Sequence, residues 1–168
     1  MVKFQLYEIE LSGEKTKIYS PMMEGDSVTL FEKFLEENNS AYPGEVTNLY
    51  DRLEIVGHET GLWEEAFDTN SGKFGANICT FKDLPGRFLR LFFIEFGMTC
   101  IVIGSGGEKP KSVIKRQQVP KLNDEVELLE KISICLQKAL KNGRIEIDDV
   151  GYINDLHDLD LNFKMDDL

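Results

Sequence analysis

Cationic side chains stand on both sides of the most apolar stretch of the chain. Arg87 and Arg90 begin a run of aromatic and β-branched residues over 88–96, and a second such run over 98–103 follows Gly97. The cations after the second run are Lys109, Lys111, Lys115 and Arg116. Arginine and lysine bind the phosphates of nucleic acids, and they can stabilise the negative charge that develops on phosphorus during phosphodiester cleavage.

The two apolar runs predict the central hairpin of a β-sheet, with its turn at Gly97. The glycine-rich segment over 104–111 predicts a loop that leaves the second strand. In an antiparallel pair, the start of the first strand and the end of the second lie at the same edge. We therefore expect Arg87, Arg90 and the lysines of this loop to form one cationic corner.

Cleavage of RNA by attack of a ribose 2′-hydroxyl on the neighbouring phosphate needs a base and an acid in addition to cations. His58 and His157 are the two histidines of the chain, and Tyr152 is an alternative to His157. A lone polar residue of this kind is more often a packing or surface residue. Three aspartates close to His157 would also repel RNA: Asp155, Asp158 and Asp160.

Metal and nucleotide sites find less support in the sequence. The segment 158–162 imitates the first ligands of a calcium loop, but Phe163 stands where that loop needs glycine. The segment 104–110 lacks the spacing of a phosphate-binding loop and is not followed by a helix. The cysteines, Cys79, Cys100 and Cys135, are far apart in apolar surroundings, which is typical of buried free thiols. The sequence predicts no bound metal and no cofactor.

The net charge of the 168-residue chain is −11, which argues against nucleic acid as a partner. The charge is unevenly distributed, however, because the segment 61–122 carries nine Lys and Arg against six Asp and Glu. No apolar run approaches the roughly 18 residues of a membrane span, and the residues after Met1 do not resemble a secretory signal. These features predict a cytoplasmic protein that does not enter a membrane.

The pattern of the remaining segments predicts a single α+β domain, with helices on one face of an antiparallel sheet. Strands are expected over 2–11, 17–19, 77–82 and 159–165. We expect one helix after Asp26 or Ser27, a second after Pro43 and Gly44, and a third from Asn123 to the stop at Asn142 and Gly143. The final strand should pair with the sheet or with the N-terminal strand, because its apolar side needs cover.

The order of these elements over roughly residues 46–140 resembles the RelE/HigB/ParE superfamily of toxins from toxin-antitoxin systems. The resemblance implies an antiparallel sheet packed against helices, with 1–45 and 143–168 as additions to the core. It also implies metal-independent cleavage of mRNA on or near the ribosome and neutralisation by a small antitoxin protein. By position it assigns catalysis to Arg87, Arg90, Lys109 and His157, and RNA binding to Lys109, Lys111, Lys115 and Arg116.

Two hypotheses from different functional classes therefore follow. The first is a toxin, or a protein derived from one, that acts on RNA through the cationic corner. The second is a non-catalytic relative whose acidic surface binds a basic protein partner. The net charge of −11 favours the second hypothesis, and the basic middle segment favours the first.

Overall fold

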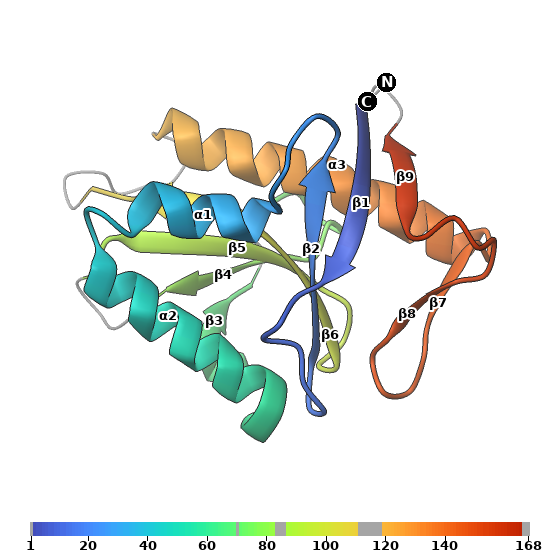
Figure 1. The fold of residues 1–168 in the computed structure, drawn as a ribbon, viewed down its shortest axis with the longest axis horizontal. Helices are drawn as coiled ribbons and strands as arrows, with labels where there is room; N and C mark the ends of the chain where they lie inside the picture. The colour runs from blue at the N-terminus through green and yellow to red at the C-terminus, as the bar shows by residue number, and fades with distance from the viewer. Residues whose placement is uncertain (1, 70, 83–86, 111–118, 166–168) are drawn as a thin grey trace.

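The computed structural model of the chain describes residues 2–69, 71–82, 87–110 and 119–165. In these ranges, helices pack against a seven-stranded sheet, and the segment after α3 forms a separate two-stranded sheet (Figure 1). The strands of the large sheet are β1 Val2–Glu8, β2 Lys17–Met23, β3 Phe67–Asp68, β4 Ile78–Lys82, β5 Leu89–Glu95, β6 Cys100–Glu108 and β9 Asn162–Met165. The small sheet pairs β7 Ile145–Ile147 with β8 Ile153–Asp155. The α+β class predicted from the sequence is confirmed.

The α-helices of the described chain are α1 Leu30–Asn38, α2 Pro43–Ile55 and α3 Pro120–Lys141. A π-helical turn, Val56–Thr60, continues α2, and a 3₁₀ turn, Glu64–Ala66, precedes β3. The segment between α2 and β4 therefore contains these two turns and the short edge strand β3. Phe67 is buried in it, and Trp63 is partly buried against the core.

The large sheet has the strand order β3-β4-β5-β6-β2-β1-β9 and is mixed rather than wholly antiparallel. Its one parallel pair joins β2 to β6, with Lys17 opposite Cys100 and Tyr19 opposite Val102. Parallel neighbours need a long crossover connection. Here α1, α2 and the β3–β5 strands supply it. The antiparallel hairpin of β5 and β6, predicted around Gly97, is confirmed.

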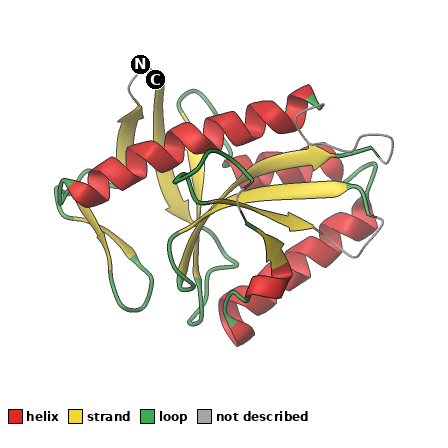
Figure 2. Ribbon diagram, turned by 180° about the vertical axis from the view of Figure 1, so that it is seen from behind, coloured by secondary structure: helices red, strands yellow, loops and turns green. Residues whose placement is uncertain are grey.

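Helices cover both faces of the sheet, so the expectation that they lie on one face is wrong. Helices α1 and α2 cover one face (Figure 1), and α3 crosses the opposite face (Figure 2). Phe93 of β5 packs in the cluster that contains Phe34 and Leu49, whereas its neighbour Phe92 packs in the cluster that contains Ile132. Successive side chains of β5 are apolar on both faces, and each face therefore needs a helix to exclude water.

Residues 104–108 of the glycine-rich segment predicted as a loop form the second half of β6, which continues to Glu108, and Lys111 lies outside the described residues. Gly106 lies against the backbone of β5, where a Cβ atom would come within 1.8 Å of the Arg90 carbonyl oxygen. A Cβ on Gly104 would come within 3.0 Å of Leu129 on α3. These glycines allow close packing of β6 against its neighbours, which is a common role of glycine inside a strand.

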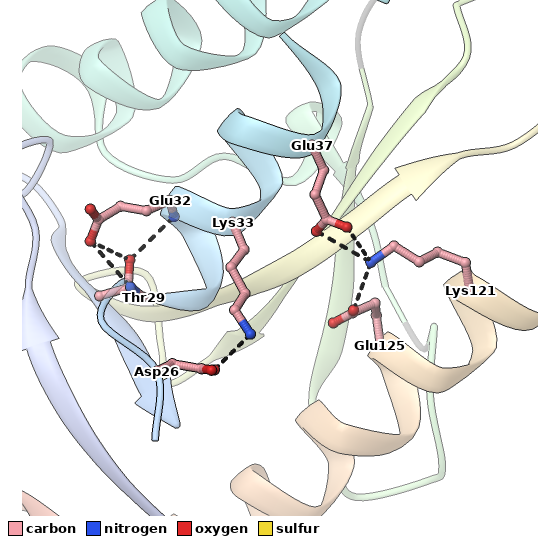
Figure 3. Close-up of polar contacts among 7 residues, drawn as sticks. All are labelled: Asp26, Thr29, Glu32, Lys33, Glu37, Lys121 and Glu125. Carbon is pink, nitrogen blue, oxygen red and sulfur yellow. Dashed lines mark hydrogen bonds and ion pairs between the residues drawn. The ribbon is translucent and has the colours of Figure 1, made fainter. Parts of the chain in front are cut away.

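Helix starts depend on local capping, and all three α-helices begin at another residue than expected. Helix α2 begins at Pro43 rather than after Gly44. Helix α1 begins at the N-cap Thr29 rather than at Asp26 or Ser27, because Thr29 and Glu32 form a reciprocal capping box (Figure 3). Helix α3 begins at Pro120, three residues before Asn123, since proline is favoured at the first helical position. Its predicted stop is confirmed by the left-handed backbone of Gly143 (φ 73°).

The C-terminal segment pairs with β1, as the sequence predicts. Strand β9 is shorter than expected, because Asp158, Asp160 and Leu161 have positive φ angles of 52–55° that belong to a turn. Phe163 of β9 stacks on Phe4 of β1 with ring centroids 5.2 Å apart. The two ends of the described chain therefore share one sheet.

The thiols differ in their expected reactivity. Burial raises the pKa of Cys100 to about 12. Burial, with a smaller contribution from the charge of Glu95, also raises the pKa of Cys79 to about 12. Cys135, by contrast, is only partly buried. Because the thiolate is the reactive form, a disulfide reagent at pH 8 should modify one thiol per native molecule, at Cys135, and all three in denaturant. Rapid native modification of Cys79 or Cys100, located by mass spectrometry, would contradict this prediction.

Candidate functional site

The register of β5 and β6 brings the predicted cations to one end of the hairpin. Leu89 lies opposite Glu108 and Arg90 opposite Gly107. One step further, the backbone N–H of Lys109 donates to the carbonyl of Phe88 at 2.8 Å. Arg87, Arg90 and Lys109 therefore all lie at this end of the hairpin, which we call the cationic corner. Lys111, Lys115 and Arg116 lie outside the described residues.

Arg90 is turned back along its own strand. Its guanidinium donates to the carbonyl of Arg87 at 3.1 Å and to that of Leu89 at 2.9 Å. Burial lowers the pKa of Arg90, although the negative charges of Asp68 and Glu45 act in the opposite direction. Arg87, by contrast, is exposed. The corner therefore offers one half-buried and one exposed guanidinium.

A buried carboxylate of α2 binds the backbone at the cationic corner. Glu45, only 6% exposed, accepts hydrogen bonds from the backbone N–H groups of Phe88 at 3.1 Å and Leu89 at 2.8 Å. These donors stand at the start of β5, and Glu45 thereby fixes the position from which Arg87 and Arg90 extend. Buried backbone donors need such partners, since an unpaired one costs about 1–3 kcal/mol.

Tyr42 and Glu108 add a second acidic contact at the same end of the sheet. A hydrogen bond to Glu108 raises the pKa of Tyr42 to about 12. The ring of Tyr42 lies 5.6 Å from that of Phe88, between centroids. Tyr42, Glu45 and Glu108 were not predicted from the sequence, because only the tertiary structure brings the start of α2 to the strand ends. An acid in the first turn of a helix is common and gave no signal of this contact.

Neither histidine of the chain lies at the cationic corner. The segment that follows β8, which includes His157, is at the opposite end of the molecule from the end of β6 (Figure 1). His157 is exposed, and its backbone N–H donates to Asp155 at 3.0 Å. His58 follows α2, thirteen positions after Glu45, which corresponds to about 20 Å along a helix. Tyr152 packs on Lys17, whose ammonium lies 4.3 Å from the ring centroid.

Lys121, another cation of the basic middle segment, is already paired with carboxylates. Its ammonium lies 2.9 Å from Glu125 and 3.4 Å from Glu37 of α1 (Figure 3). Burial lowers the pKa of Lys121, but the hydrogen bond and the charges of these two glutamates outweigh that effect and raise it. Lys121 therefore links α3 to α1 rather than extending the cationic corner.

Comparison of the chain with protein-family models, curated proteins and solved structures finds no match. Within the described ranges, no group of three or more His, Cys, Asp or Glu side chains is arranged to hold a metal ion. No helix in those ranges is long and apolar enough to cross a membrane. The cationic corner brings together positive charges of the kind that bind phosphate in other proteins. Among the residues that the structure describes, it contains no histidine for proton transfer.

Proposed function

We propose that the protein acts on RNA in the manner of RelE/HigB-like toxins, with Arg87, Arg90 and Lys109 contacting backbone phosphates. The register of β5 and β6 is the single observation that supports this proposal, since it gathers cations from two separate segments. Positive charge at this place would stabilise the additional negative charge on phosphorus during metal-independent cleavage of mRNA. His157 is not part of the proposed site, because its segment lies at the other end of the molecule. A toxin of this kind would act in the cytoplasm and would be held inactive by a small antitoxin protein.

The proposal is tested by replacing Arg87 and Lys109 together with alanine. The double variant should bind a fluorescein-labelled single-stranded RNA more weakly, and the slope of log affinity against log salt should fall by about one for each phosphate that is no longer bound. Replacing Lys131 and Lys141 on α3 removes the same charge from exposed positions elsewhere and should change the slope by less. Cleavage of the RNA and growth arrest on expression should follow the same order.

Two results would contradict the RNA proposal. One is an equal loss of affinity in both double variants, which would show that net charge rather than the corner governs binding. The other is a wild-type chain that neither binds RNA at low salt nor arrests growth.

The second candidate function is binding of a basic protein partner. The observation that favours it is the net charge of −11, together with the glutamates Glu8, Glu10, Glu32 and Glu36 that line two hollows beside α1, where no lysine or arginine is among the described lining residues. Such a complex should form at low salt and dissociate at high salt, because exposed charges are screened. The product of a neighbouring gene, co-expressed with this chain, is the first partner to test.

A further inference from the structure

An acidic groove lies between the end of β1 and α1, and none of Arg87, Arg90 and Lys109 lines it. It encloses about 540 Å³. Its apolar lining comes from Tyr7, Ile9, Met22, Phe31 and Leu35. A second hollow of about 640 Å³ between α1 and α2 shares Leu35 with it and extends it towards Tyr50.

The groove exists because α1 and α2 cover only part of their face of the sheet. Phe4 and Leu6 of β1 point into the core on the α3 side. Tyr7, which points the other way, is 39% exposed, and Met22 on the neighbouring strand is only partly buried. An apolar sheet surface therefore continues beyond the edge of α1 without a helix of the described chain over it.

Three glutamates lie beside the apolar residues that line the groove, and a hydroxyl group donates a hydrogen bond to each of them. Ser12 donates to Glu8 at 2.6 Å, and Thr29 to Glu32 at 3.0 Å. The Tyr50 hydroxyl donates to Glu10, and this hydrogen bond raises the pKa of Tyr50 to about 12. Surface carboxylates usually lose side-chain entropy when they bind a partner, and carboxylates that are already held lose less.

No lysine or arginine is among the described residues that line the two hollows, whereas Glu8, Glu10, Glu32 and Glu36 are. Lys33, the lysine of α1, is paired with Asp26, whose carboxylate oxygen lies 2.6 Å from the Lys33 ammonium (Figure 3). An apolar floor with walls of one charge sign selects a partner that combines apolar anchors with the opposite charge.

We infer that this groove binds an amphipathic segment of a partner protein, with apolar side chains seated on Phe31 and Leu35 and with Lys or Arg paired to Glu8, Glu10 and Glu32. The inference rests on the second candidate function and specifies its surface. It does not depend on whether the cationic corner binds RNA.

The test uses a fluorescein-labelled synthetic helix of about four turns, with leucines along one face and lysines on the other, and a second peptide in which serines replace the leucines. Binding to the full chain is followed by fluorescence anisotropy at low salt. The triple variant E8Q/E10Q/E32Q removes three charges, while the glutamine oxygen can still accept each internal hydrogen bond. The matched triple E64Q/E127Q/E146Q removes three charges from exposed positions on other elements.

The groove triple should weaken binding of the leucine peptide by about ten-fold, and the matched triple by less than about two-fold. Leu35→Gln and the serine peptide should each weaken binding as well, since both remove apolar contact. Hydrogen exchange should show protection by the peptide at the end of β1 and along α1. Thermal unfolding of the variants checks that their fold is retained.

Other outcomes separate the failure of this inference from that of the basic-partner function. If both triples lose affinity equally, or if the serine peptide binds as well as the leucine peptide, then charge alone governs binding and the groove is not the site. If neither peptide binds the wild-type chain at low salt, the inference fails; the basic-partner function fails only if the co-expressed product of the neighbouring gene also forms no salt-sensitive complex.

Discussion

Replacing Phe163 with alanine is expected to lower the free energy of unfolding by about 3–5 kcal/mol. Phe163 is 2% exposed and joins three parts of the molecule. Its ring stacks on Phe4 of β1, and the guanidinium of Arg144 lies 4.2 Å from its centroid. Truncation to alanine removes the aromatic pair and leaves a cavity under α3, so that β9 loses much of its attachment to β1. Chemical denaturation measures the change.

Leu159→Ala is the matched control for Phe163→Ala. Leu159 lies in the same segment, but it is 50% exposed, and its truncation should change the free energy of unfolding by less than about 0.5 kcal/mol.

Removal of all residues after Gly151 should destabilise the whole protein cooperatively, because it removes Phe163 together with the rest of β9. A truncated chain as stable and soluble as the full chain would show that β9 contributes no essential contact.

Replacing Gly106 with alanine is expected to cost about 2–3 kcal/mol of stability. The added Cβ would come within 1.8 Å of the Arg90 carbonyl oxygen and within 2.8 Å of its carbonyl carbon. Both atoms belong to the backbone of β5, and the clash can be relieved only by moving one strand of the central hairpin. Because Arg90 belongs to the cationic corner, the same shift should weaken RNA binding if that proposal is correct.

Gly44→Ala serves as the control for Gly106→Ala. A Cβ atom at Gly44, in the first turn of α2, would meet no atom within 4 Å. Its replacement should therefore leave stability unchanged or raise it by up to about 1 kcal/mol, because alanine favours the helix and leaves the unfolded chain less conformational freedom than glycine does. Gly104→Ala should lie between the two, because its nearest neighbour is the movable side chain of Leu129. Equal stability of the Gly106 and Gly44 variants would contradict the close approach of β6 to β5.

Local patterns in the sequence predicted most of the elements correctly. Alternating or aromatic-rich runs identified β1, β4, β5, β6 and β9, and apolar residues at helical spacing identified the three α-helices. The pairing of β9 with the sheet was also predictable, because an alternating strand leaves one apolar side that water cannot cover favourably. The placement of Arg87, Arg90 and Lys109 at one end followed from strand direction alone. In an antiparallel hairpin, the start of the first strand and the end of the second lie together at the end opposite the turn.

Only the tertiary structure decided the features that depend on contacts between distant segments. The parallel pairing of β2 with β6 joins the edges of two strands far apart in the sequence. The position of α3 opposite α1 and α2 follows from the need of both faces of β5 for cover. The strand character of residues 104–107 depends on the close approach of β5 and α3, whereas glycine by itself indicates a turn equally well. The burial of Glu45 at the corner, and the placement of the segment after β8 at the far end of the molecule, likewise depend on how the elements pack. The spacing of two residues along a chain does not determine their distance in space.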